Sequence, residues 1–157
     1  MTNITTIGGT MGHDPASVAR QLYDNWNKRD FDASAALTAD DCVVTLAGSG
    51  EQFHGPDGAI EYGRRWADAF PDGRIAVDNV IASGDHAVVQ FRGSGTHTGT
   101  LRTPMGDIPA TGKHVDLQLC DVHRIADGKI QASTSYFDAA AMMAQLGLMP
   151  EPAAAKA

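Results

Sequence analysis

The sequence predicts an α+β fold in which a strongly bent, mainly antiparallel sheet wraps around N-terminal helices. Helical patterns come early and strand patterns come late, which is typical of α+β proteins and differs from the alternation of βαβ units. Long strand patterns follow one another after residue 73. Gly93 and Gly95 interrupt one of them, and glycine inside a strand often marks a bulge or a bend. A sheet bent in this way would leave a conical cavity.

The length of 157 residues suits one domain. We expect a flexible N-terminus over 1–14, a single domain over 15–150 and a flexible tail over 151–157. Hydrophobic residues make up 43% of the chain and charged residues 20%, which is ordinary for a globular protein. No internal repeat and no linker divides the chain.

The charge argues against nucleic-acid and membrane partners. The net charge is −7 and there is no block of Lys or Arg, whereas phosphates and anionic lipids require basic residues. No apolar segment approaches the ~20 residues of a membrane span. The first residues lack the pattern of a signal peptide, so we expect a cytoplasmic protein. Cys42 and Cys120 fit no zinc or redox spacing, and the six histidines show no metal-binding spacing, so no metal site is expected.

Helices are predicted where apolar residues recur with helical spacing. Asp14 as N-cap and Pro15 at the first helical position begin the first helix, in which Val18, Leu22 and Trp26 form an amphipathic stripe. The remaining helices are expected at about 32–37, from 56 or 57 to 70, and at about 139–146, closed by Gly147.

Strands are predicted at 42–46, 74–82 and 86–98 because these segments are rich in β-branched and alternating apolar residues. Residues 99–112 contain two prolines and three glycines and are expected to form a loop.

The segment 113–138 is the most informative part of the chain. It contains two strand patterns joined by Asp127-Gly128, a sequence that favours a two-residue type I′ hairpin turn. The expected cross-strand pairs are Leu119 with Tyr136, Asp121 with Thr134, and His123 with Ala132. Since side chains alternate between faces, one apolar face would carry a few titratable groups, as in a small-molecule site.

We predict Asp121, His123 and Asp138 as catalytic residues. Desolvation on an apolar face raises the pKa of a carboxyl toward a value useful for acid–base chemistry. Asp121 and His123 lie on one face, about 7 Å apart along the strand. The alternatives are a structural ion pair for Asp121 and His123, and a helix N-cap for Asp138.

Other residues are predicted to line a substrate pocket. Tyr136 would donate a hydrogen bond to an oxyanion, or pack as an ordinary aromatic residue. His97 lies on an apolar-leaning strand face, where a structural histidine is the alternative. The predicted pocket residues are Trp26, Trp66, Phe70, His97, Leu119, Thr134 and Tyr136.

Several short motifs occur in an order shared with one family. They are Phe53-His54-Gly55-Pro56, Ala69-Phe70-Pro71-Asp72, Gly95-Thr96-His97-Thr98-Gly99, Ile108-Pro109-Ala110-Thr111-Gly112-Lys113, Asp127-Gly128-Lys129-Ile130 and Gln145-Leu146-Gly147-Leu148. With them the chain, from about residue 16 to 150, resembles the SnoaL-like polyketide cyclases of the nuclear-transport-factor-2-like superfamily. The resemblance implies a cone-shaped α+β barrel with a deep pocket, no cofactor, and a homodimer or larger assembly formed through the outer sheet face.

The sequence departs from the cyclase pattern at the catalytic positions. Counted from the Asp-Gly turn, the acid/base aspartate of the aldol cyclases falls at Ser135 and their histidine at Asp121. Their pocket aromatic falls near Trp26, which is kept. The aldol mechanism therefore does not transfer residue by residue, and Asp121, His123 and Asp138 would supply the same chemical groups from other positions.

Three functions are open. The first is a cofactor-independent acid–base enzyme that cyclises, isomerises or dehydrates a hydrophobic polycyclic or polyketide-like molecule, or assists its hydroxylation as some relatives do. The second is a non-catalytic module that binds such a molecule. The third is an interaction domain that uses the outer sheet face, which predicts a large exposed apolar patch and no cavity.

Overall fold

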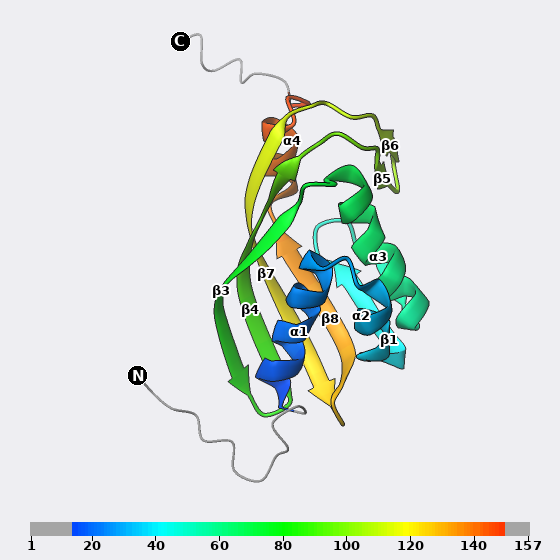
Figure 1. The fold of residues 1–157 in the computed structure, drawn as a ribbon, viewed down its shortest axis with the longest axis vertical. Helices are drawn as coiled ribbons and strands as arrows, with labels where there is room; N and C mark the ends of the chain where they lie inside the picture. Colours follow the sequence, from blue (N-terminus) through cyan, green and yellow to red (C-terminus); the bar gives the residue numbers. More distant parts are fainter. Residues whose placement is uncertain (1–13, 150–157) are drawn as a thin grey trace.

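A computed structural model describes residues 14–149 and has the predicted α+β architecture, a curved sheet with helices on its concave side (Figure 1). Of the flexible termini predicted at 1–14 and 151–157, residues 1–13 and 151–157 lie outside the described residues, whereas Asp14 is described as the N-cap of α1. The helices and strands are α1 (Pro15–Asn27), α2 (Phe31–Ala36), β1 (Thr38–Leu46), β2 (Gln52–His54), α3 (Gly55–Ala69), β3 (Arg74–Ser83), β4 (His86–Thr96), β5 (Leu101–Thr103), β6 (Gly106–Ile108), β7 (His114–Ala126), β8 (Lys129–Phe137) and α4 (Ala139–Gln145).

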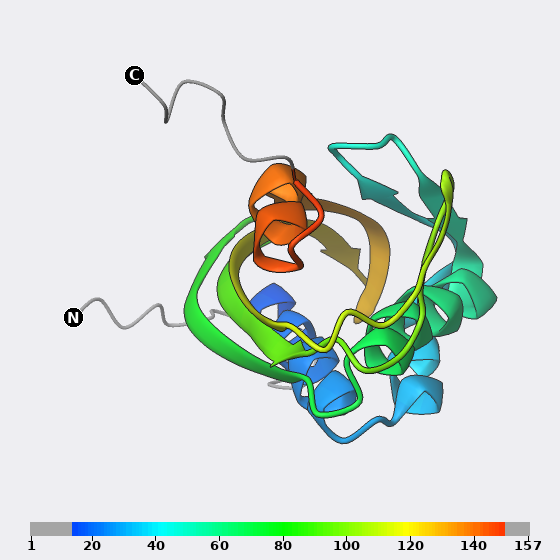
Figure 2. The same cartoon turned by 90° about the horizontal axis from the view of Figure 1, so that it is seen from above.

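Six strands form the main sheet in the order β2-β1-β8-β7-β4-β3. Only β1 and β8 pair in parallel, and the other pairs are antiparallel. Seen from above, the sheet curves around α1, with α3 along its other side and α4 over one end (Figure 2). This arrangement confirms the cone-shaped fold and encloses the cavity described below.

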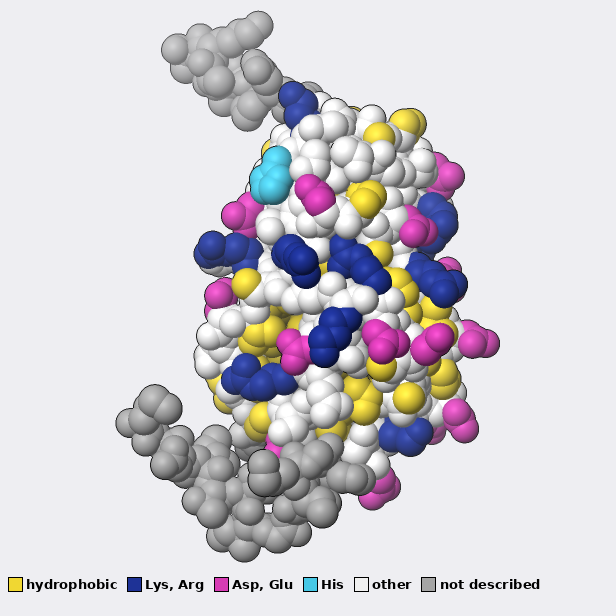
Figure 3. All heavy atoms as spheres, in the orientation of Figure 1, with side chains coloured by type: hydrophobic (Ala, Val, Ile, Leu, Met, Phe, Trp, Pro, Cys, Tyr) yellow, Lys and Arg dark blue, Asp and Glu magenta, His cyan; other side chains and the backbone are white. Residues whose placement is uncertain are grey.

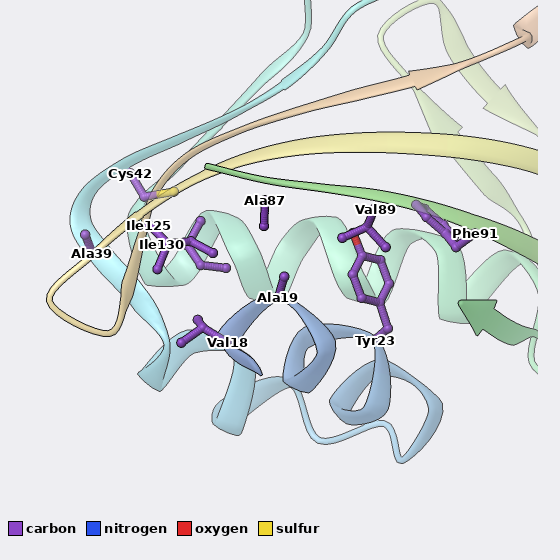
Figure 4. Close-up of a cluster of buried hydrophobic side chains, with 10 residues drawn as sticks. All are labelled: Val18, Ala19, Tyr23, Ala39, Cys42, Ala87, Val89, Phe91, Ile125 and Ile130. Atoms are coloured by element: carbon purple, nitrogen blue, oxygen red, sulfur yellow. The ribbon is translucent and has the colours of Figure 1, made fainter. Parts of the chain in front are cut away.

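Helix α1 begins where the sequence predicts, because Asp14 accepts a hydrogen bond from the backbone N–H of Ser17 at 2.7 Å. Its buried residues are Val18, Ala19 and Tyr23. They pack against the inner face of the sheet, and Tyr23 projects from the helix toward β4 (Figure 4). A second buried cluster, which includes Phe70, Val115 and Leu146, fills the end of the cone under α4.

The Asp127-Gly128 turn is confirmed. Both residues have positive φ, 55° and 72°, and Ala126 pairs with Lys129 across a two-residue loop, as a type I′ turn requires.

The register predicted beyond the turn is wrong because β8 contains a bulge. Ile125 pairs with Ile130, but the next pair is Arg124 with Ala132, which leaves Gln131 as an extra residue. The actual pairs are Leu119 with Phe137, Asp121 with Ser135, and His123 with Ser133. A one-residue shift moves every later side chain to the other face.

The shift corrects two predicted pocket residues. Tyr136 is 51% exposed, and Thr134 pairs with Val122 on the outer face of the sheet. Ser133 and Ser135 are buried in their place.

Three further differences concern short or extended strands. Strand β1 begins at Thr38 rather than at residue 42, and β2 over 52–54 was not predicted. The predicted loop 99–112 contains the β5–β6 hairpin, in which the hydroxyl of Thr103 donates to the carbonyl of Gly106 at 2.6 Å. The strands β5 and β6 have three residues each and lie in a segment rich in proline and glycine, so the sequence pattern predicts a loop there.

The two strand glycines do not mark bulges, since β4 and β7 pair without interruption through Gly93 and Gly95. Gly95 instead permits a close approach, because a Cβ there would lie 3.0 Å from the Cβ of Phe70 and 3.1 Å from the Cα of Gly73. Register shifts occur instead in β3 near Asp78 and in β8 at Gln131.

On the face of the molecule shown in Figure 3, Lys and Arg side chains form a loose band across the middle, and Asp and Glu side chains lie mostly toward its edges. Among residues 14–149, no helix is long and apolar enough to cross a membrane.

Candidate active site

A cavity of about 190 Å³ lies between the helices and the inner face of the sheet. Most of its wall is aliphatic or aromatic, and its polar side chains include residues of α1, α3, β7 and β8. Of the predicted pocket residues, Trp26, Trp66, Phe70 and Leu119 line this cavity. A cavity with an apolar wall and a few converging polar groups is typical of a small-molecule site.

Asp121, His123 and Tyr23 meet in the wall of this cavity. The hydroxyl of Tyr23 donates to Oδ2 of Asp121 at 2.8 Å, and the Tyr23 oxygen lies 2.8 Å from Nε2 of His123. Nδ1 of His123 lies 2.6 Å from the hydroxyl of Ser133. Nε2 of His123 and Oδ2 of Asp121 are 4.0 Å apart, so Tyr23 bridges the predicted pair.

Proton counting assigns the tautomer of His123. The single hydroxyl proton of Tyr23 points to Asp121, so the Tyr23 oxygen can only accept from Nε2–H of His123. Nδ1 then accepts from the hydroxyl of Ser133. Every hydrogen bond in the series that runs from Ser133 to Asp121 therefore has one donor and one acceptor when the imidazole is neutral and the carboxylate is ionised.

Burial shifts the pKa of each titratable group in this series. It raises the pKa of the Asp121 carboxyl, while His123, Ser135 and Tyr23 act in the opposite direction. Burial lowers the pKa of His123, opposed by the charge of Asp121. The pKa of Tyr23 lies well above its ordinary value, first because of burial and then because of Asp121. His123 is therefore neutral at pH 7, and Tyr23 keeps its proton.

The second oxygen of Asp121 has no partner. Oδ1 is buried without a hydrogen bond among the described residues, and so is Oγ of Ser135 on the opposite strand. Ser135 lies near enough to lower the pKa of the Asp121 carboxyl, although the two groups do not meet standard hydrogen-bond geometry. Both residues line the cavity, so two unpaired polar atoms belong to side chains of its wall.

Asp138 and His97 lie apart from this group. Oδ1 of Asp138 accepts from the backbone N–H of Ala141 at 2.9 Å as the N-cap of α4, and its side chain is exposed. His97 is fully buried but is not among the cavity-lining residues. Its Nδ1 accepts from the backbone N–H of Thr111 at 3.2 Å, so His97 holds the segment that leads into β7.

Sequence reasoning missed Tyr23, Tyr62 and Ser133. Tyr23 is four residues after Ala19 and therefore on a buried stripe of α1, a pattern that indicated burial but not the approach to Asp121. Tyr62 and Ser133 carried no distinguishing signal.

No three His, Cys, Asp or Glu side chains within 14–149 are grouped so that they could hold a metal ion.

Comparisons with known proteins agree with this fold. A family model described as SnoaL-like polyketide cyclase matches residues 16–146. A search of the curated proteins finds no match.

Three solved structures illustrate the similarity. A candidate SnoaL-like polyketide cyclase from Jannaschia sp. CCS1 has 21% identity and a TM-score of 0.78, with 96% of this chain and 100% of that chain covered. AclR, a candidate hydroxylase from Streptomyces galilaeus, has 20% identity and a TM-score of 0.72, with 89% of each chain covered. IdmH, a candidate polyketide cyclase from Streptomyces antibioticus, has 26% identity and a TM-score of 0.71, with 86% of this chain and 99% of that chain covered.

Proposed function

Because the chain belongs to the SnoaL-like polyketide cyclase family, we propose that it is a cofactor-independent acid–base enzyme. Its substrate is a hydrophobic polycyclic or polyketide-like molecule, which it cyclises, isomerises or dehydrates. Asp121 is the general base that removes a proton from a carbon next to a carbonyl group.

One observation carries this proposal. Oδ1 of Asp121 is buried in the wall of an apolar cavity and has no hydrogen-bond partner among the described residues, whereas Oδ2 is held by Tyr23. A desolvated carboxylate with one free oxygen is a stronger base than one in water, because burial disfavours its charged form.

Tyr23, His123 and Ser133 are positioning residues in this proposal. They fix the orientation of the carboxylate through Oδ2 and leave Oδ1 to the substrate. His123 has both ring nitrogens engaged by protein groups, so its contribution is to keep Tyr23 in place.

Proton removal can be measured without the natural substrate. 2-Tetralone is a bicyclic ketone with acidic hydrogens next to its carbonyl, and its deuterium uptake in D₂O can be followed by NMR. We expect the protein to accelerate this exchange and Asp121→Asn to lower the rate at least about 100-fold, as is typical when a general base is removed.

Asp138→Asn is the matched control, since Asn is also a good N-cap and should leave folding and exchange unchanged. Full exchange activity in Asp121→Asn would contradict the proposal. If the folded wild type binds 2-tetralone but never exchanges its protons, the second candidate, non-catalytic binding, is favoured instead; the apolar aromatic wall supports that candidate.

We also propose that the protein forms a homodimer through the outer face of the sheet. Ile81, Val88 and Val122 form one row across β3, β4 and β7, and Ile81 is 55% exposed. Light scattering should give twice the chain mass, and Val122→Glu should give the monomer mass. A monomeric wild type at micromolar concentration would contradict this proposal.

A further inference from the structure

We propose that Tyr62 and Ser135 bind the oxygen of an enolisable ketone beside Asp121, so that the cavity selects substrates whose carbonyl oxygen reaches this position. This inference rests on the proposed role of Asp121 as a base. It identifies the groups that hold the oxygen while Asp121 takes the neighbouring proton.

Ser135 is placed by the bulge in β8. It lies directly opposite Asp121 in the β7–β8 pair, and paired side chains on one face have Cβ atoms about 5 Å apart. Only 3% of Ser135 is exposed, and its Oγ has no hydrogen-bond partner among the described residues. Buried hydroxyl groups are normally satisfied, so this unpaired donor points to a group that the cavity receives.

Tyr62 lines the same cavity from α3. Its ring packs between Phe53, at a centroid distance of 5.1 Å, and Trp66, at 6.4 Å. These contacts fix the direction of the ring, and Tyr62 lines the cavity. Within residues 14–149 its hydroxyl makes no hydrogen bond of standard geometry.

Two effects on the pKa of Tyr62 agree with this position in the cavity wall. Burial raises the pKa of Tyr62 most, followed by the charge of Asp121. The Ser135 hydroxyl and the Trp66 indole lie near enough to lower it slightly. Tyr62 therefore stays protonated at neutral pH, so its hydroxyl is a hydrogen-bond donor in the cavity that Asp121 and Ser135 also line.

The three groups match one chemical pattern. Two hydroxyl donors and one carboxylate acceptor are complementary to a carbonyl oxygen and the C–H beside it. A hydrocarbon would leave all three polar groups unsatisfied in an apolar wall, which is unfavourable. Donors aimed at a developing oxyanion stabilise the transition state more than the neutral ketone.

The step balances without a further reactant. The substrate C–H proton moves to Oδ1 of Asp121, the C–H electron pair forms the C=C bond, and the C=O π electrons move to oxygen. The resulting enolate oxygen accepts hydrogen bonds from Tyr62 and Ser135. Asp121 returns the proton to the same or another carbon, so nothing is oxidised or reduced.

The test is equilibrium binding of 2-naphthol, which has the planar ring and hydroxyl of an enol, compared with naphthalene. We expect the wild-type protein to bind 2-naphthol about tenfold or more tightly than naphthalene, measured by ligand fluorescence. Tyr62→Phe and Ser135→Ala should each weaken 2-naphthol binding about 3- to 12-fold, which is within the range for the loss of one hydrogen bond to a neutral oxygen. Naphthalene binding should change less than about twofold.

A matched control exists in the same chain. Tyr136→Phe removes a hydroxyl from the outer face of the sheet and should leave the preference for 2-naphthol unchanged. The inference is overturned if the wild type shows no preference, if the Tyr62 and Ser135 variants keep it, or if they lose affinity for both ligands equally.

Asp121→Asn separates this inference from the proposed function. Removing the negative charge beside the oxygen site should preserve or tighten 2-naphthol binding while it abolishes ketone exchange. If the wild type prefers 2-naphthol over naphthalene but does not exchange ketone protons, the proposed enzymatic function is contradicted and the proposed oxygen-binding site is not. Exchange that depends on Asp121, with no effect of Tyr62 or Ser135 on naphthol binding, would contradict the oxygen site alone.

Discussion

The hydroxyl of Tyr23 lies 2.8 Å from Oδ2 of Asp121 and joins two residues that are 98 positions apart in the sequence. The contact ties α1 to the middle of β7. It also separates Asp121 from His123, which share a strand face but meet only through the tyrosine oxygen. The acid–base group of this cavity is therefore built from a helix and a hairpin together.

Tyr23→Phe should remove this bridge without changing the packing of the ring. Asp121 and His123 would each lose a buried hydrogen bond, and we expect the free energy of unfolding to fall by about 1–3 kcal/mol. The pKa of Asp121 should rise further, because Tyr23 is one of the groups that lower it. The midpoint of ketone exchange against pH should then move upward.

Urea denaturation and the pH profile of exchange check this prediction. Tyr136→Phe on the outer face is the control, and it should change neither quantity. An unchanged stability in Tyr23→Phe would mean that the bridge contributes nothing.

His123 should make the fold less stable in acid. Burial lowers its folded pKa, so the unfolded chain binds the proton first as the pH falls below about 6.5. The contribution of His123 to the free energy of unfolding is complete above about pH 6.5 and is lost as the pH falls toward the pKa of the folded state. Asp121, whose folded pKa is raised, acts in the opposite sense, because the folded state then binds its proton first.

The Asp121→Asn background isolates the histidine. There the free energy of unfolding should fall between pH 7 and 5, and His123 should contribute at most about 1.4 kcal/mol per pH unit to this slope, the limit for one proton. Adding His123→Gln should reduce this slope, while His97 is present in both proteins. Equal slopes in the two proteins would contradict the prediction.

Deletion of Gln131 should remove the bulge and restore the simple register. Ser133 and Ser135 would then turn outward, and Thr134 and Tyr136 would turn into the cavity. We expect a loss of about 3 kcal/mol or more, since a tyrosine cannot replace a serine in a packed wall without strain.

Circular dichroism and thermal unfolding measure the expected loss of stability, and naphthol binding measures the change in the cavity wall. Gln131→Ala keeps the residue count and is the control; it loses the side-chain hydrogen bonds to the carbonyls of Ala126 and Lys129 but should retain the register. A deletion variant with normal stability and binding would show that β8 tolerates both registers.

Asp138→Ala should cost about 1 kcal/mol of stability, the usual value for an N-cap. Its carboxylate accepts the backbone N–H of Ala141 in α4, and its side chain lies outside the cavity wall. Ketone exchange should be retained at temperatures where the protein is folded. A loss of exchange in Asp138→Asn, with stability unchanged, would restore the catalytic role predicted from the sequence.

Much of the fold could be predicted because it depends on local chemistry. Asp14 and Pro15 begin α1, Asp127 and Gly128 close the main hairpin, and Gly147 follows α4 with φ of 75°. Each of these residues acts within a few positions of itself, so the sequence contains the whole cause. The prediction that Asp121 and His123 point inward is also correct. Both lie on β7, where side chains alternate regularly between the two faces, and the bulge lies in β8.

The amino-acid sequence by itself determined the class of fold, the hairpin and the presence of a carboxylate on an apolar strand face. The tertiary structure decided what that carboxylate meets. One extra residue at Gln131 exchanged Tyr136 for Ser135 in the wall, and the curvature of the sheet brought Tyr23 and Tyr62 to the cavity. A bulge changes the side-chain period at a single point, and helix-to-strand contacts depend on packing over the whole chain, so neither leaves a local pattern to detect.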